Sequence, residues 1–238
     1  MLLHSLRLFV SFLCYLTVSN LYADIYDYIY PNTDPSFSNY GGIGLIQNPT
    51  ARFLDEGTLA FSWSHNDPYL RGSIIAYPFN WLEASFQYTD VNDELYSEVK
   101  AFSGSQTLKD KSFDAKFLLS KESDYIPQVA LGFRDLGGTG RFASEYVVLN
   151  KYLGKNLDIS FGIGWANLNG NEISNPLTKI SNRFKTRSDR PDLGGKVNTN
   201  NFFSGSAGYF GGIEYLIPNF NGLKMKIEFD GTNYQTES

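Results

Sequence analysis

The residues best suited to catalysis stand together near position 65. Ser64, His65 and Asp67 carry the hydroxyl, imidazole and carboxylate groups of a hydrolase triad. Triad residues usually converge from distant parts of a chain, and these sequence neighbours at a strand end do not converge in that way. We therefore interpret His65 as a turn residue. The sequence predicts no catalytic residues and a protein that is not an enzyme.

Two further motifs have the composition of ligand sites but the wrong context. Asn92, Asp93 and Glu94 offer the oxygen ligands that calcium prefers, yet consecutive polar residues are more typical of a solvated loop. The glycine-rich GGTG at 137–140 has no following lysine and no helix, so it predicts a β-turn rather than a phosphate-binding loop. No histidine and acid cluster has metal-ligand spacing. We predict no metal site and no cofactor.

A local excess of positive charge lies in segment 167–207 of a chain whose formal net charge is −5. These basic residues suit the phosphates of lipopolysaccharide or an acidic polysaccharide, which they would bind through charge-assisted hydrogen bonds. The five candidates are Lys179, Arg183, Lys185, Arg187 and Arg190. Two alternatives remain. The segment either folds into the lumen of a β-barrel and pairs with Glu83, Glu145 or Glu228, or it is an ordinary solvated loop.

The elements that position all these residues are predicted to be β-strands. In the segment 157–165, Leu157, Phe161 and Trp165 alternate with small or polar residues such as Ser160 and Gly162. A period of two puts the large residues on one face of a strand. Similar segments recur in meander order along the chain, with no convincing helix of ten residues or more. The sequence therefore predicts an all-β fold of about eight antiparallel strands.

Loop lengths and aromatic residues favour lipid, rather than a protein core, against the apolar face. The connections 66–69, 90–111, 134–140 and 167–207 alternate with those at 79–81, 121–127, 153–156 and 218–222, and both very long loops fall in the first set. Long outer loops, short periplasmic turns and aromatic residues at strand ends are typical of outer-membrane barrels. We predict an up-and-down barrel of this type, which faces lipid outside.

Charged residues of both signs share the opposite faces of these strands. In a barrel they would line the lumen and pair there, whereas in an ordinary sheet they would face solvent. The predicted lumen-lining residues are Glu83, Asp114, Lys116, Arg134, Glu145, Glu214, Lys224, Lys226 and Glu228.

The N-terminus predicts secretion. Residues 1–23 combine the basic Arg7, an apolar stretch from 8 to 18 and a plausible cleavage point at Ala23. Phe12 and Leu13 precede Cys14, and their size argues against a lipoprotein site there. Loss of Arg7 with this segment changes the formal net charge from −5 to −6, which argues against nucleic acid as a partner. We expect an N-terminal arm at 24–56, a barrel at 57–231 and a tail at 232–238.

Four segments carry a resemblance to a known family. They are GGIGLIQNPTARFLDEGTLAFSWS (41–64), GFRDLGGTGRFASEYVVLNKYL (132–153), LDISFGIGWANLNG (157–170) and YFGGIEYLIPNFNGLKMKIEFDGTNY (209–234). Together they resemble the YjbH/GfcD family of outer-membrane proteins linked to exopolysaccharide or group 4 capsule export. The resemblance implies an outer-membrane β-barrel that assists export or surface assembly, with lipid, polysaccharide and other export-system proteins as partners. It implies no catalytic residues.

The chain ends soon after its last predicted strand, whereas members of the family are longer. The resemblance therefore indicates a short paralogue, a truncated gene or one half of a split protein, with a barrel that is incomplete or closed by another chain. Two other classes of function remain as alternatives. One is a small outer-membrane enzyme acting on lipid or polymer, and the other is a soluble periplasmic β-barrel that binds an apolar ligand.

Overall fold

The computed structural model describes residues 35–97, 99–188, 197, 199–218 and 223–236. The predicted signal peptide at 1–23, the first part of the N-terminal arm and Arg190 lie outside the described residues.

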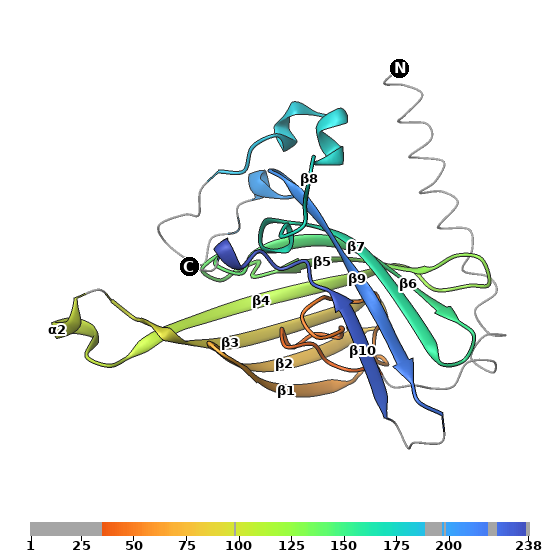
Figure 1. Ribbon diagram of the computed structural model, residues 1–238, viewed down its shortest axis with the longest axis horizontal. Coiled ribbons are helices and arrows are strands. Elements are labelled where there is room, and N and C mark those ends of the chain that lie inside the picture. Colours follow the sequence, from red (N-terminus) through yellow and green to blue (C-terminus); the bar gives the residue numbers. More distant parts are fainter. Residues whose placement is uncertain (1–34, 98, 189–196, 198, 219–222, 237–238) are drawn as a thin grey trace.

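Ten antiparallel strands form one curved sheet (Figure 1). The strands are β1 (Leu59–Asn66), β2 (Tyr69–Phe79), β3 (Leu82–Leu95), β4 (Thr107–Ser120), β5 (Gln128–Arg134), β6 (Ser144–Leu153), β7 (Leu157–Trp165), β8 (Glu172–Ile173), β9 (Ala207–Leu216) and β10 (Lys224–Phe229). Nine of them follow one path from β1 to β10, and the short β8 pairs with the start of β9. Apart from β8, strands that follow one another in the chain are neighbours in the sheet, as predicted.

The all-β antiparallel fold is confirmed, but the sheet is not closed into the predicted barrel, and it has ten strands rather than about eight. Within the described residues, β1 pairs only with β2, and β10 pairs only with β9. Each pair along the path is antiparallel, so β1 and β10 run in the same direction. The two edges therefore cannot join as the antiparallel pair that an up-and-down barrel requires.

The two faces of the sheet are inverted relative to a soluble protein. On the convex face, named here the outer face, Phe61, Trp63 and Ile227 are 67%, 64% and 56% exposed. On the concave face, named the inner face, Arg71 and Lys116 are only 2% and 1% exposed. Soluble sheets bury their apolar face and expose their polar one. In this sheet the apolar face is exposed and the polar face is buried.

Residues 36–53 lie against the inner face, and this segment is named the plug. Figure 1 shows the sheet curled around it, in orange. The plug is folded on itself by two isolated bridges, Phe37 with Ile43 and Gly44 with Pro49. The sequence placed it in an extended arm before the first strand. The structure instead uses it to fill the concave side of the sheet.

The β3–β4 hairpin extends well beyond the rest of the sheet at one end (Figure 1). Its strands include many of the residues predicted as the loop 90–111, and the connection between them is 96–106, with the short helix α2 (Lys100–Ser103). Charged residues lie on both faces of this extension, and its apolar residues, such as Val91 and Leu108, are too few to set up a period of two. Ion pairs such as Asp90 with Lys109 hold the two strands together instead.

Several side chains on β2 and β6 face the opposite way from the prediction. The sequence predicts lipid against the large apolar residues of the strands, yet Ile75, Tyr77, Tyr146 and Val148 are buried on the inner face. The plug supplies apolar partners there, because Ile43 packs with Ile75 and Tyr77. In the described part of the chain, no helix has the length and apolar character needed to cross a membrane.

Candidate functional site

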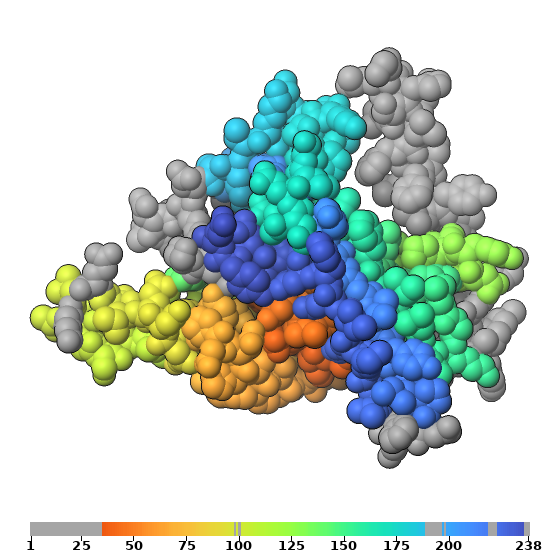
Figure 2. All heavy atoms as spheres, viewed as in Figure 1, coloured from red at the N-terminus to blue at the C-terminus, as the bar shows by residue number. Residues whose placement is uncertain are grey.

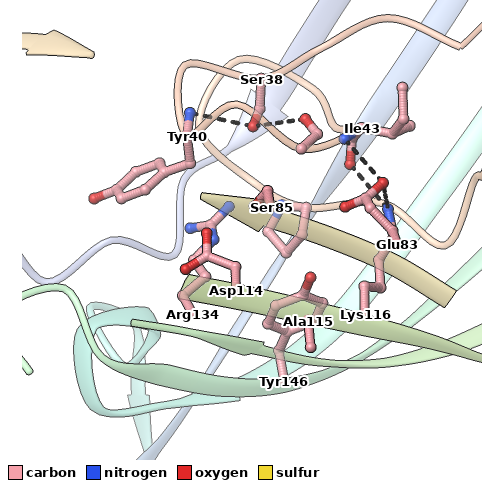
Figure 3. A pocket seen from close by; sticks show the side chains of 12 residues that line it. Ser38, Tyr40, Ile43, Glu83, Ser85, Asp114, Ala115, Lys116, Arg134 and Tyr146 are labelled. Atoms are coloured by element: carbon pink, nitrogen blue, oxygen red, sulfur yellow. Dashed lines mark hydrogen bonds and ion pairs between the residues drawn. The ribbon is translucent and has the colours of Figure 1, made fainter. Parts of the chain in front are cut away.

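Beside its apolar contacts, the plug makes polar contacts with the inner face that centre on Glu83 of β3 (Figure 3). Its carboxylate oxygen Oε2 lies 2.9 Å from Nζ of Lys116 and accepts a hydrogen bond of 2.6 Å from the Tyr77 hydroxyl. The same oxygen accepts a bond of 3.4 Å from the backbone N–H of Ile43 in the plug. Lys116 also donates to the backbone carbonyl of Arg52 at 2.9 Å. One ion pair of the sheet thus binds two points of the plug.

A second attachment lies where the plug ends. Arg52 donates from Nε and Nη2 to the two carboxylate oxygens of Asp158 on β7, at 2.9 and 2.7 Å. Its Nη1 lies 2.7 Å from Glu122, and its guanidinium stacks over the ring of Tyr152 at 4.0 Å. Burial lowers the pKa of Arg52, but the hydrogen bonds and charge of Asp158 outweigh that effect and raise it. Arg52 is therefore permanently charged and fully paired.

The third attachment joins the plug to β10. Glu228 accepts hydrogen bonds from three consecutive backbone N–H groups, those of Ile46, Gln47 and Asn48, at 2.9 to 3.2 Å. Two residues earlier on the same face, Lys226 donates to the backbone carbonyls of Gly44 and Leu45, each at 2.8 Å. Glu228 thus accepts from backbone N–H groups, and Lys226 donates to backbone carbonyls. Together they bind residues 44–48 of the plug to β10 through the backbone.

Two arginines hold Tyr40 of the plug by its ring. Arg134 lies 4.1 Å and Arg71 lies 4.3 Å from the ring centroid, in the geometry of cation–π contacts. Arg71 also lies over Tyr69 and Phe142, at 4.2 and 5.2 Å. These buried cations are therefore surrounded by aromatic faces, which tolerate a desolvated positive charge better than aliphatic groups do.

Little space remains between the plug and the centre of the sheet. The pocket drawn in Figure 3 lies between Tyr40 and Ile43 of the plug and Glu83, Lys116 and Arg134 of the sheet. Its cavity volume is about 20 Å³, enough for one water molecule and too small for a sugar. The plug therefore fills the inner face at this level.

Carboxylates gather near the end of β5, above the plug. The backbone N–H of Asp135 donates to Asp114 at 2.8 Å, and Thr139 donates to Asp110 at 2.7 Å. Burial raises the pKa of the Asp135 carboxyl to about 8, and the charge of Asp110 contributes to the shift. Asp135 is therefore protonated at neutral pH. Within the described residues, no group of three or more histidine, cysteine or acidic side chains is placed to hold a metal ion.

Glu145 lies on the outer face, so its prediction as a lumen-lining residue is wrong. It pairs across the sheet with Phe133, whereas its inward neighbours Ser144 and Tyr146 pair with Arg134 and Gly132. The other eight predicted residues are on the inner face. Six of these contact the plug directly: Glu83, Lys116, Arg134, Glu214, Lys226 and Glu228. Of the other two, Lys224 binds Glu214, and Asp114 binds the N–H of Asp135.

The basic segment divides into a paired part and an exposed part. Arg187 binds the carboxylate of Glu145 at 2.8 and 2.9 Å, so the loop folds back onto the sheet on its outer side rather than into a lumen. Lys179, Arg183 and Lys185 are exposed. Lys185 lines an open groove with Glu172, Ser174, Thr178 and Ser206.

The triad-like residues do not form a relay. His65 Nε2 lies 3.0 Å from Asp67 Oδ1, but the Ser64 hydroxyl donates to the backbone carbonyl of Asn39 in the plug, at 2.8 Å. Sequence reasoning missed the plug contacts of Arg52 and Asp158 altogether. The sequence feature that came nearest to indicating the plug was the set of charged residues on the inner face of β10, namely Lys224, Lys226 and Glu228. In the described part of the chain, their cross-strand ion pairs lie within the β9–β10 hairpin.

A sheet with its polar residues on a concave, plugged face and its apolar residues exposed on the convex face defines a class of inverted β-sheet proteins. The family described as "Exopolysaccharide biosynthesis protein YbjH" matches residues 36–238, and the chain belongs to this family. This confirms the resemblance seen in the sequence.

One curated relative is the "Uncharacterized lipoprotein YjbH" of Escherichia coli (strain K12). It is 44% identical over 205 residues, which cover 85% of this chain and 29% of that protein. The chain therefore spans less than a third of the length of this relative. No solved structure matches the chain.

Proposed function

We propose that this chain is a non-enzymatic β-sheet protein of the bacterial outer membrane that assists exopolysaccharide or capsule export or surface assembly. The observation that carries the membrane part is the inverted pattern of the two faces. Large apolar side chains on the outer face, such as Phe61, Trp63 and Phe113, are more than half exposed. Monomeric soluble proteins rarely expose large continuous apolar patches, whereas membrane strands alternate apolar residues toward lipid with polar residues inward.

Aromatic side chains near strand ends support the same proposal. Phe79 and Trp81 stack at 5.2 Å beside the β2–β3 turn, and Tyr209 stacks on Phe229 at 5.4 Å. All four are exposed on the surface. Aromatic rings prefer the interface between hydrocarbon and water, where they form girdles around membrane barrels. We place these pairs at that interface.

Family membership carries the export part of the proposal. The exposed Lys179, Arg183 and Lys185 stand ready for an acidic polymer or for lipopolysaccharide phosphates, because none of them is committed to the sheet as Arg187 is. The groove beside Lys185 is lined by hydroxyl groups that suit sugar hydrogen bonds. Because the plug fills the inner face, we place polymer contact on this outer loop rather than in the lumen.

The localisation is tested by fractionation of cells that express the full chain. We expect the mature protein, cleaved near Ala23, to sediment with the outer membrane and to resist extraction by alkaline carbonate. Recovery in the soluble periplasm without detergent would refute the proposal and favour a soluble ligand-binding protein. The export role is tested by gene deletion, which should lower cell-surface polysaccharide. A His65→Ala variant should restore it as well as the native protein does.

A further inference from the structure

The loop between β7 and β9 is held against the outer face of the sheet. Arg187 binds Glu145 at 2.8 and 2.9 Å, and the backbone N–H of Phe203 donates to the same carboxylate at 3.0 Å. The ring of Phe203 also packs on Phe133 and Trp165, with ring centroids 5.7 and 5.2 Å apart. Figure 2 shows the loop, in teal and cyan, away from the orange plug. The loop therefore lies on the side of the sheet where the proposed function puts lipid.

The same loop starts at the level of an aromatic pair that the proposed function places at the membrane interface. Asn171 donates to the backbone carbonyl of Tyr209 at 3.1 Å, and the Tyr209 ring stacks on Phe229. The next residue, Glu172, pairs with Gly208 in the short strand β8. A strand rises about 3.4 Å per residue, so this start lies only a few ångströms beyond the aromatic rings. Polar headgroups occupy about 5–8 Å on each side of the hydrocarbon, so the loop starts among them.

A buried asparagine gives this loop a fixed shape. Asn175 is 5% exposed, and its side-chain amide donates to the backbone carbonyls of Phe184, Phe203 and Gly205 at 2.8 to 3.1 Å. Its Oδ1 accepts from a backbone N–H at 3.0 Å at the start of the 3₁₀-helix η4 (Pro176–Lys179). One side chain thus joins both arms of the loop, so the charges on these arms are carried by a folded unit.

The two arms of the loop border an open groove of about 670 Å³. Small-molecule sites have volumes of about 300–1,000 Å³, so the groove is large enough for a sugar. Its lining offers the hydroxyl groups of Ser174, Thr178 and Ser206, the carboxylate of Glu172 and the ammonium group of Lys185. Hydroxyl and carboxylate oxygens suit the hydroxyl groups of a sugar, and the ammonium group suits a phosphate. The groove therefore matches a phosphorylated sugar better than a simple anion.

We propose that this groove binds the phosphorylated sugar headgroup of an outer-leaflet glycolipid, which in an outer membrane is lipopolysaccharide. Lys185 binds a phosphate in the groove, and the exposed Lys179 and Arg183, on neighbouring 3₁₀-helices, bind further phosphates. The inference rests on the proposed membrane location and selects one of the two anionic ligands considered there. Position favours the lipid over a secreted acidic polymer, because the loop is held on the lipid side of the sheet and starts at headgroup level.

The test is displacement of fluorescent lipid A from the detergent-solubilised full chain. The competitors are unlabelled bisphosphorylated lipid A, phosphatidylglycerol as an anionic lipid without the sugar, and polygalacturonate as an acidic polymer without lipid. We expect lipid A to compete at about tenfold lower concentration than the other two, because only lipid A supplies phosphate, sugar hydroxyl groups and acyl chains together.

Two variants and a matched control locate the binding site. Arg183→Gln with Lys185→Gln should weaken lipid A binding about tenfold or more, because two charge-assisted hydrogen bonds are lost. Lys121→Gln with Lys155→Gln removes the same charge from exposed turns at the opposite end of the sheet and should bind as the native chain does. Ser174→Trp fills the groove without a change of charge, so it should weaken lipid A binding and leave phosphatidylglycerol binding unchanged. Circular dichroism confirms the β-sheet content of each variant.

Three outcomes would overturn the proposal. Equal competition by lipid A and phosphatidylglycerol would show unspecific attraction between charges, and stronger competition by polygalacturonate would show that the loop binds a secreted polymer instead. The third is native-like lipid A binding by the folded Arg183 and Lys185 double variant. Fractionation separates this test from the proposed function. Recovery in the soluble periplasm overturns the membrane location itself, whereas an outer-membrane chain without preference for lipid A overturns only the glycolipid site.

Discussion

Arg52 in the plug and Asp158 on β7 form a two-point ion pair, 106 residues apart in sequence, with hydrogen bonds of 2.9 and 2.7 Å. Both side chains are about 90% buried. A buried charge that loses its partner keeps its desolvation cost without compensation. This pair is therefore the most sensitive point at which to loosen the plug.

Replacement of Arg52 by Met is expected to destabilise the folded protein by about 3–5 kcal/mol, because Asp158 loses its countercharge. The matched control is Lys151→Met, which removes a more exposed ion pair with the same Glu122 and should cost at most about 1 kcal/mol. Urea unfolding of the detergent-solubilised chain measures both. Equal losses in the two variants would contradict the importance of the Arg52–Asp158 pair.

The glycines of β7 leave room for inward side chains of its neighbours. A Cβ atom added at Gly162 would lie 2.2 Å from Cζ of Phe210 on β9. Gly162→Ala should therefore destabilise the protein by roughly 1–3 kcal/mol through overpacking. Combining it with Phe210→Leu should recover part of the loss. Gly137→Ala is the control, since its added Cβ would meet only Phe113 at an ordinary 3.7 Å. Full tolerance of Gly162→Ala would show that the space is empty.

Charge on the outer face tests the lipid environment. Phe113→Arg places a cation among the apolar residues of the sheet and, near the bilayer midplane, should cost about 2–4 kcal/mol. Phe102→Arg is the matched control, because Phe102 is even more exposed but lies in α2 at the tip of the extended hairpin. Folding into lipid vesicles, followed by mobility on unheated gels, measures the difference. Similar behaviour of both variants would place the outer face in water.

Asp135 makes stability depend on pH. Its pKa is raised from 3.8 to about 8 by burial and by the charge of Asp110. Between about pH 4 and pH 8 the folded state holds a proton that the unfolded state lacks, so stability falls as pH rises through this range. Asp135→Asn should remove this dependence and stabilise the protein at pH 7.

Asparagine also suits the backbone at this position, where φ is +51°. Asp67→Asn, at a carboxylate that is 86% exposed, is the control and should leave the effect of Asp135 unchanged. Unfolding midpoints measured from pH 5 to pH 8 provide the readout. A midpoint that falls equally with pH in native protein and in Asp135→Asn would rule out Asp135 as its origin.

The sheet was predictable because period-two alternation is strong in most strands. Leu157–Trp165 alternates perfectly, and the structure gives it the same bounds and the predicted apolar outer face. Glu145 was misplaced because β6 is apolar on both faces. Val147 and Leu149 point outward, whereas Tyr146 and Val148 point inward onto the plug cluster with Ala51 and Phe210. Alternation cannot orient a strand that is buried on one side by another segment.

The plug could not be predicted for a related reason. Residues 41–52 have three glycines and a proline and lack any regular period, so they indicate only a turn-rich segment. Their structure depends on partners far along the chain, such as Asn150, which accepts from Ala51, and Glu228. The open edges of the sheet could not be predicted either. Alternation in the sequence indicates where strands lie, but it does not show whether the first and last strands pair to close a barrel.

The contact between Glu228 and the backbone of the plug joins two segments that lie about 180 residues apart. The plug leaves the ribosome before any strand, whereas Glu228 belongs to the last strand of the sheet. The plug therefore lacks the contacts of Lys226 and Glu228 until β10 has joined the sheet. A chain interrupted before β10 would keep strands β1 to β9 but lose these contacts. Such a product would leave the backbone N–H groups of Ile46, Gln47 and Asn48 without their acceptor.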